Sequence, residues 1–178
     1  MNHFGTISLN TNRLTLRKFK SSDIKEAYEN WTSDNKVTTF LTWETHSSEE
    51  ITKNIINNWI NSYDNKNFYQ WAIILKNENI NIGTISIVEL DESLQSVTIG
   101  YCIGSKWWNQ GIVSEAFKEV IAFLFEKVKV NKIVSYHDVE NPNSGKVMLK
   151  CGLKYEGTNI KGIRDISLYG LVKREYKI

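Results

Sequence analysis

A change of hydrophobic period near residue 68 constrains the fold of this chain more than any other feature. Before it, apolar residues recur at helical spacing; after it, three β-rich runs follow one another with only short polar connections. The runs are FYQWAIILK (68–76), INIGTISIVEL (80–90) and LQSVTIGYCIG (94–104). The connections at 77–79 and 91–93 have the length and composition of turns, so the pattern predicts an antiparallel meander.

Helices and further strands flank this meander on both sides. Predicted helices cover residues 21–31, 47–63, 112–128 and 143–150, and predicted strands cover 13–19, 132–139, 153–160 and 165–177. The order β-α-α-β-β-β-α-β-α-β-β predicts an α/β fold with a mixed sheet. No linker, repeat or low-complexity run interrupts this order, so we expect one domain over residues 1–178.

Composition narrows the class of protein. The 178 residues are 41% hydrophobic with one proline, which favours a packed globular domain over a disordered chain. A net charge of +2 gives no reason to expect a nucleic-acid or membrane partner, and no window approaches the roughly 20 apolar residues of a membrane span. Cys102 and Cys151 lie far apart and outside any metal-binding spacing, so we expect no metal and a cytoplasmic, reducing environment.

The stretch WWNQGIVSEA (107–116) joins the last strand of the meander to a predicted helix. The first N–H groups of a helix have no internal partner and lie at the positive end of the helix dipole, so they can bind a phosphate. Gly111 would let the backbone approach that phosphate closely. One glycine, with neither GK[ST] nor GxGxxG, also fits an ordinary strand-to-helix turn.

Four blocks that follow one another along the chain change this balance. They are GTISIVELDES (83–93), TIGYCIGSKWWNQGIVSEAF (98–117), HDVENPNSGKVMLKCGLKYEG (137–157) and LYGLVKREY (168–176). The series resembles the GNAT superfamily of acyl-CoA-dependent N-acetyltransferases, and most of all the branch of the ribosomal-protein N-terminal acetyltransferases RimJ and RimL. The resemblance extends from about Arg13 to the last strand.

The resemblance implies a fold and an activity. The fold would have a mixed central sheet of about six to seven strands, flanked by about four helices. Two neighbouring strands, here 94–104 and 132–139, would splay apart to bind acyl-CoA. The activity would be direct transfer of an acetyl group from acetyl-CoA, as co-substrate, to a primary amine.

The resemblance also implies where acetyl-CoA binds. The pyrophosphate loop of the family maps onto residues 108–113, although Trp108 and Val113 depart from its usual residue types. The strand before the loop would bond the pantetheine arm, and the family's Asn-x-x-Ser matches residues 141–144. The implied contacts are Cys102, Ile103, Asn109, Gln110, Gly111, Ile112, Val113, Ser114, Asn141 and Ser144. Trp107 and Trp108 would close the loop over the core or line the acceptor groove.

Catalysis requires a neutral amine, a polarised thioester carbonyl and a stabilised leaving thiolate. We expect a backbone N–H near Ile103 to polarise the carbonyl and the Ser144 hydroxyl to bond the thiolate, although Ser144 also fits a simple helix cap. Glu89 is the first candidate for the base, because it ends the strand that faces the acceptor in this family. His137 has the better matched ordinary pKa. Two further candidates for the base are Asp91 and Asp138.

Two departures from the family leave an alternative open. Thr98 and Met148 stand where relatives often carry a Glu base and a Tyr acid, so the chain could instead be a non-catalytic, acyl-CoA-binding regulatory module. The acceptor is equally open between a protein N-terminal α-amino group and a small molecule such as a polyamine or aminoglycoside, and a homodimer is possible. A cationic substrate would suit Glu44, Glu49 and Glu50. Three tryptophans lie in the region that covers the acceptor in this family, and we expect them to form part of the core or of the wall of the acceptor site: Trp31, Trp43 and Trp59.

Overall fold

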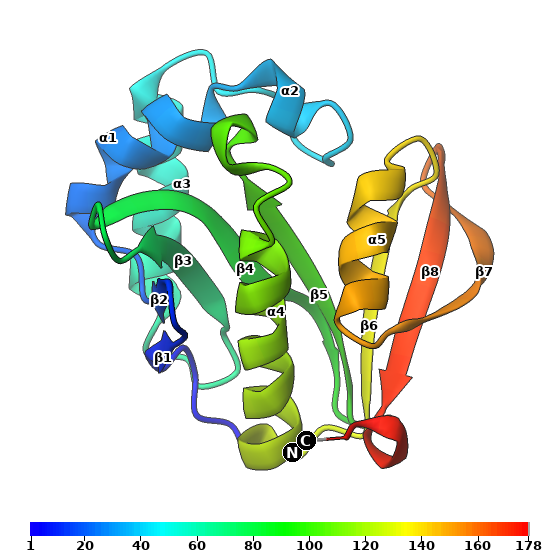
Figure 1. The fold of residues 1–178 in the computed structure, drawn as a ribbon. Helices are drawn as coiled ribbons and strands as arrows, with labels where there is room; N and C mark the ends of the chain where they lie inside the picture. The colour runs from blue at the N-terminus through cyan, green and yellow to red at the C-terminus, as the bar shows by residue number, and fades with distance from the viewer. Residues whose placement is uncertain (178) are drawn as a thin grey trace.

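One mixed sheet of eight strands organises the chain in a computed structural model that describes residues 1–177 (Figure 1). The strands are β1 (Leu9–Asn10), β2 (Leu14–Arg17), β3 (Gln70–Leu75), β4 (Ile80–Asp91), β5 (Ser96–Ile103), β6 (Lys132–Asp138), β7 (Lys154–Lys161) and β8 (Arg164–Val172). Their order across the sheet is β1-β2-β3-β4-β5-β6-β8-β7. The predicted α/β class and meander are confirmed. The predicted strand number was too low because β1, with two residues, is too short to show an alternating pattern.

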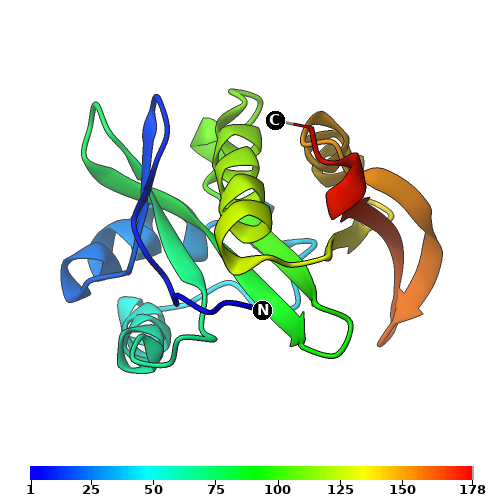
Figure 2. The same ribbon diagram turned by 90° about the horizontal axis from the view of Figure 1, so that it is seen from below.

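Helices cover both faces of this sheet. They are α1 (Ile24–Ala27), α2 (Asn35–Thr38), α3 (Glu49–Ser62), α4 (Ile112–Phe123) and α5 (Pro142–Lys150). Figure 2 shows α4 and α5 on one face, with α1 and α3 on the other. Only α2 was not predicted, because four residues are too few for a periodic pattern. α3 begins at Glu49 with Ser48 as its N-cap, two residues after the predicted start at residue 47.

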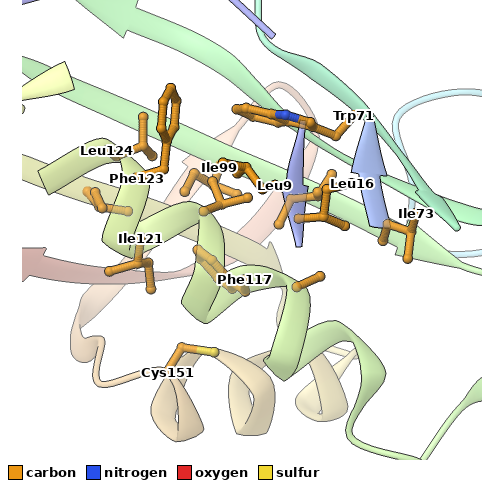
Figure 3. Packing of buried hydrophobic residues seen from close by; sticks show 14 of the residues in the cluster. Leu9, Leu16, Trp71, Ile73, Ile99, Phe117, Ile121, Phe123, Leu124 and Cys151 are labelled. Atoms are coloured by element: carbon orange, nitrogen blue, oxygen red, sulfur yellow. The ribbon is translucent and has the colours of Figure 1, made fainter. Parts of the chain in front are cut away.

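The larger core lies between α4 and the sheet. Apolar residues of α4 recur at helical spacing and face β1 to β5. Figure 3 shows Phe117 and Ile121 directed toward Leu9, Leu16 and Ile99 of the sheet. The buried residues of this helix are Ile112, Ala116, Phe117, Val120, Ile121 and Phe123. A smaller core on the opposite face joins α1 and α3 to β3. The two cores fix the helices that flank the centre of the sheet.

The sheet opens between β5 and β6, which are its only parallel neighbours. Pairing is confined to Ser96–Thr98 against Lys132–Val134, although β5 continues to Ile103 and β6 to Asp138. In Figure 1 the two strands meet at the lower end of the molecule and part toward the upper end. β6 pairs with β8 along the whole length of β6, and β8 pairs with β7, so these three strands diverge from β5 together. The predicted splay is confirmed.

Phe117 is a direct test of how α4 is held. Its ring is fully buried between α4 and the sheet, 5.5 Å from the ring of Tyr101. Phe117→Ala should lower the free energy of unfolding by about 3–5 kcal/mol, because it leaves a cavity that the sheet cannot fill. Urea unfolding would measure this. The matched control is Lys118→Ala on the exposed side of the same helix, which should cost little; equal losses would contradict the packing described.

Candidate active site

A cavity of about 480 Å³ lies where β5 and β6 separate. Its inner wall comes from the splayed strands and the start of α5, and its outer wall from the helical segment 28–32 that follows α1, from α3 and from the segment between α2 and α3. The inner residues include Gly100, Tyr101, Cys102, Ser135, His137, Asn141 and Ser144, and the outer ones Trp31, Thr32, Phe40, Trp43, His46, Thr52 and Trp59. The cavity therefore joins residues from both halves of the chain.

The edge of β5 that faces this gap carries backbone polar groups. Successive residues of a strand direct N–H and C=O to opposite sides, and the Ile99 carbonyl accepts from Ser135 Oγ of β6 at 2.8 Å. Tyr101 and Ile103 therefore direct their own groups into the gap. The Ile103 carbonyl accepts from the Trp108 indole Nε1 at 3.0 Å. Within residues 1–177, strand pairing on this side ends at Thr98.

Near the end of this edge, residues 109–111 lead into α4. Gly111 is the N-cap of the helix, with φ +73°, and Asn109 also has a left-handed backbone, with φ +61°. A Cβ on Gly111 would have one neighbour within 4 Å among the described residues, the Arg13 guanidinium at 3.8 Å. The exposed backbone of residues 109–111 therefore lies next to the first amides of α4, a helix of 12 residues whose first N–H groups have no partner within the helix.

The other residues predicted from the loop motif lie in or beside the first turn of α4. Asn109 and Gln110 are exposed, whereas Ile112 is buried in the core. Val113 and Ser114 are half-buried, and the Ser114 carbonyl accepts a weak bond from a cysteine thiol of α5. The side chains at 112–114 therefore serve packing, and the exposed residues 109–111 are the part that a ligand could reach.

Arg13 ties the start of β2 to this loop. Its Nε lies 2.6 Å from a carboxylate oxygen of Glu115, and its Nη1 donates to the Gln110 carbonyl at 3.0 Å. Burial acts to raise the pKa of Glu115, but hydrogen bonds from Thr11 and Arg13 hold it below its ordinary value. These contacts connect the loop to the start of β2 and to the first turn of α4.

The two tryptophans of the loop have different roles. Trp107 is 5% exposed and packs into the larger core, where the absence of a side chain at Gly104 makes room for its ring. Trp108 is 42% exposed and is held by its indole bond to Ile103. Neither lines the cavity. Of the two predicted roles, closure over the core applies to Trp107.

Ser144 lies in the first turn of α5 and lines the cavity. Its Oγ accepts from the Asn141 side-chain amide at 3.2 Å, so its own hydroxyl hydrogen is available to an acceptor in the cavity. The Ser144 carbonyl accepts from the Tyr101 hydroxyl at 3.0 Å. This last bond joins β5 to α5 across the gap, and burial raises the pKa of Tyr101. Sequence reasoning missed Tyr101, whose place directly before Cys102 in the predicted strand was the available signal.

Of the predicted bases, Glu89 lies outside the lining of the cavity. Its carboxylate is ion-paired with Lys161 and accepts from the Thr98 hydroxyl at 3.1 Å. The hydrogen bond from Lys161 holds the pKa of Glu89 below its usual value. Asp91 is exposed at the end of β4 and bonds its own turn. The Glu89 carboxylate is thus ionised and shared with a cation.

His137 and Asp138 both line the cavity. His137 Nδ1 lies 2.7 Å from the Asp138 carbonyl, which can only accept, so Nδ1 donates this bond and Nε2 is the nitrogen left for another partner. This Nε2 is buried and has no hydrogen-bond partner among the described residues. It faces α5 at Gly145, where a Cβ would lie 2.7 Å from it. The Asp138 carboxylate is 3.2 Å from Arg164 Nη1.

A third imidazole, His46, also lines the cavity, and sequence reasoning missed it. His46 Nδ1 lies 2.8 Å from the Thr52 hydroxyl, which in turn lies 2.8 Å from that of Thr32. The ring packs 5.2 Å from Trp43, and burial lowers the pKa of His46. No motif surrounds this residue, so only the fold of the segment before α3 could reveal its position.

Among the predicted cofactor contacts of β5, Cys102 lines the cavity. Burial raises the pKa of its thiol to about 12, so the side chain is a neutral, apolar surface at neutral pH.

Residues 1–177 contain no cluster of three or more His, Cys, Asp or Glu side chains placed to hold a metal ion. Over the same range, no helix combines the length and apolar character that crossing a membrane would require.

Comparison with known proteins identifies the family. The acetyltransferase (GNAT) domain matches residues 13–154, which is most of the chain. The chain belongs to the GNAT acetyltransferase family. The resemblance found in the sequence is thereby confirmed, and the chain is an N-acetyltransferase. GNAT acetyltransferases use acetyl-CoA, and the catalytic alternative is favoured over a regulatory module.

Individual relatives agree with this family. The chain is 29% identical over 177 residues to an N-acetyltransferase named p20 from Bacillus licheniformis, covering 95% of this chain and 98% of p20. It is 26% identical over 110 residues to the ribosomal-protein-serine acetyltransferase of Escherichia coli, covering 62% of this chain and 60% of that protein. A GNAT acetyltransferase structure from Bacillus anthracis, 28% identical, superposes with a TM-score of 0.82 and covers 94% of this chain and 99% of the other.

Gly145 tests the close approach of α5 to β6 and β8 in this GNAT domain. Alanine normally stabilises a helix by about 1 kcal/mol relative to glycine. Here a Cβ would lie 2.7 Å from both His137 Nε2 and the Tyr169 hydroxyl oxygen. Gly145→Ala should therefore destabilise the protein by about 1–3 kcal/mol in urea unfolding. Lys150→Ala, exposed on the same helix, is the control; a stabilised Gly145→Ala would contradict the contact.

Proposed function

We propose that acetyl-CoA lies along the open edge of β5, with its pyrophosphate at the start of α4 and its thioester beside the cavity. The acceptor amine then enters the cavity and receives the acetyl group directly. The observation that carries this proposal is the continuity of three features: the polar edge at Tyr101 and Ile103, the exposed backbone at 109–111, and the cavity. Backbone groups could hold the amide-rich pantetheine arm as a strand would be held.

The pyrophosphate has a suitable site in the loop. The unpaired amides at the N-terminus of α4 and the helix dipole both favour a doubly charged group. Gly111 leaves the space that this group needs, and Arg13 adds a positive charge next to it. Backbone binding explains why Trp108 can replace the usual Gln or Arg, since side chains contribute little to such a loop.

The chemical step places one demand on each group. The amine nitrogen attacks the thioester carbonyl, a C–N bond forms, and the C–S bond then breaks to release the CoA thiolate. The N–H of Ile103 on the open edge donates to the carbonyl oxygen as negative charge develops there. The Ser144 hydroxyl donates a hydrogen bond to the departing sulfur and keeps its own proton, and the released CoA thiolate takes up a proton from solvent. Asn141 holds the Ser144 oxygen in place.

The attacking amine must also lose a proton. Glu89 and His137 stay predictions for this role, but Glu89 is shared with Lys161, and the free Nε2 of His137 is enclosed. His46 lines the cavity, and its low pKa keeps the imidazole neutral at pH 7. We therefore assign the amine proton to His46, with the Thr52 hydroxyl orienting the ring.

The acceptor itself is a protein N-terminal α-amino group or a small-molecule amine. The ribosomal-protein relative supports the first by its name, and a cavity of about 480 Å³ supports the second. The cytoplasmic location and a homodimer stay predictions from the sequence.

Gly111→Val tests the pyrophosphate loop. A β-branched side chain at φ +73° strains the loop and fills the space beside the amides, so acetyl-CoA affinity should fall by about 100-fold or more. Calorimetric titration would measure this. Gly162→Val is the matched control, because Gly162 also has a left-handed backbone, φ +63°, but lies in the β7–β8 turn. Wild-type affinity in Gly111→Val would exclude the loop as the binding site.

Ser144→Ala separates a catalytic hydroxyl from a helix cap. If Ser144 bonds the thiolate, the variant should lower kcat by about 10–100-fold with little change in the Kd for acetyl-CoA, because the bond strengthens as charge develops. Asn143→Ala, exposed in the same turn of α5, is the control. An unchanged kcat would leave Ser144 as a cap only.

The pH dependence of kcat/KM tests His46. Because burial lowers the pKa of His46 from 6.5, the imidazole stays neutral down to that lowered value and becomes protonated below it. Activity should therefore fall on the acidic side with an inflection below pH 6.5, and this inflection should be missing in His46→Gln. An unchanged inflection in the variant would assign it to another group.

A further inference from the structure

We infer that the acceptor is a single amine on an aromatic or bulky apolar body that also carries one negatively charged group, and not a polyamine or aminoglycoside. This inference rests on the proposed function, because it concerns the occupant of the same cavity. Three observations carry it: the indoles of the outer wall, the charges that line the cavity, and the cations at its mouth.

The outer wall is aromatic. Trp31 and Trp43 meet edge to face at a centroid distance of 6.3 Å, and Trp59 and Phe40 complete the wall. The Trp31 indole N–H is already bonded to Asn81 at 2.7 Å, so the Trp31 ring offers the cavity an apolar surface and no donor. Such a wall favours a flat or bulky apolar group, since aromatic contacts add to the area buried.

The charges that line the cavity do not suit a polycation. The one carboxylate among the lining residues is Asp138, and it is paired with Arg164. A neighbouring pocket lies between the segment 38–45 and the β7–β8 turn at 161–164. Glu44 lines only this neighbouring pocket, and the two glutamates at the start of α3 line neither it nor the cavity. A second ammonium group would therefore enter an apolar site without a counter-ion, which is unfavourable. The acidic residues expected to attract a cationic substrate do not face the amine.

Two cations lie at the mouth of the cavity. Lys161 and Arg164 lie on either side of the β7–β8 turn and line both the cavity and the neighbouring pocket, where Trp43 is also shared. Lys161 lies 4.2 Å over the Tyr136 ring and is ion-paired with Glu89. Arg164 is paired with Asp138, but the side chains of Lys161 and Arg164 are 42% and 39% exposed, so each can bond a second anion. A carboxylate or phosphate on the distal end of the acceptor would meet both cations while its amine points toward the splayed strands.

Four matched dipeptides test the two parts of this inference. They are the C-terminal amides of phenylalanyl-aspartate, phenylalanyl-asparagine, phenylalanyl-lysine and alanyl-aspartate, so that only the aspartate side chain carries a negative charge, with spermidine as the polycation. Acetylation is followed by CoA release and mass spectrometry. We expect phenylalanyl-aspartate to exceed phenylalanyl-lysine and alanyl-aspartate by about tenfold in kcat/KM, with phenylalanyl-asparagine between and spermidine lowest.

Variants then assign the preferences to residues. In Lys161→Gln, the kcat/KM for the aspartate dipeptide divided by that for the asparagine dipeptide should fall toward one. The same fall is expected when Lys161→Gln is combined with Glu89→Gln, a double variant in which Glu89 is not left as an unpaired carboxylate. Lys154→Gln, an exposed and ion-paired lysine at the other end of β7, should leave the ratio unchanged. Trp43→Ala should reduce the preference for phenylalanyl over alanyl. Because each comparison is a ratio of kcat/KM values for two substrates of the same variant, any change in kcat that affects both substrates equally cancels.

The outcomes separate this inference from the proposed function. Equal rates for the four dipeptides, or faster acetylation of spermidine or phenylalanyl-lysine, would overturn the substrate class while confirming acetyl transfer. Acetylation of none of them by a protein that binds acetyl-CoA would also overturn the substrate class. A protein that does not bind acetyl-CoA would overturn the proposed function itself.

Discussion

The parting of β5 and β6 is the constraint on which the rest of this structure depends. Two parallel strands that remained paired would satisfy one another's backbone groups, and no ligand could enter the sheet. Here pairing ends after Thr98, and the polar edge of β5 beyond it is left without a strand partner over the described residues. An unsatisfied backbone group in a buried place is costly, so this edge favours a ligand that can bond it.

Two hydrogen bonds bridge the gap between β5 and the part of the structure that contains β6 and α5. Ser135 Oγ reaches the Ile99 carbonyl from β6, and the Tyr101 hydroxyl reaches the Ser144 carbonyl in α5. Each bond spans the gap without closing it as a backbone ladder would. Gly145 lets α5 lie directly against β6 and β8, which brings the Ser144 turn to the gap. The width of the opening is therefore set by particular side chains, and the same side chains place the groups that the chemistry needs.

Much of this arrangement could be predicted from the sequence. The meander, the long amphipathic helix and the turn at Gly111 follow from period and turn chemistry, and the ordered blocks identified the family. Local patterns could not reveal contacts between distant segments. Arg13 and Glu115 are 102 positions apart, and His46 meets Thr32 and Thr52 only after the outer wall has folded. The chemistry of a side chain also depends on its partners. The sequence gives no partner for the Glu89 carboxylate, but in the structure this carboxylate is ion-paired with Lys161.

Amide hydrogen exchange at single residues, with and without acetyl-CoA, tests the central claim most directly. If acetyl-CoA bonds the open edge of β5, exchange at Tyr101 and Ile103 should slow by about tenfold or more at saturating ligand, because these amides would exchange mainly from the free protein. Amides of the β7–β8 hairpin should change little. Binding of acetyl-CoA that slows exchange elsewhere but leaves Tyr101 and Ile103 unchanged would contradict the account.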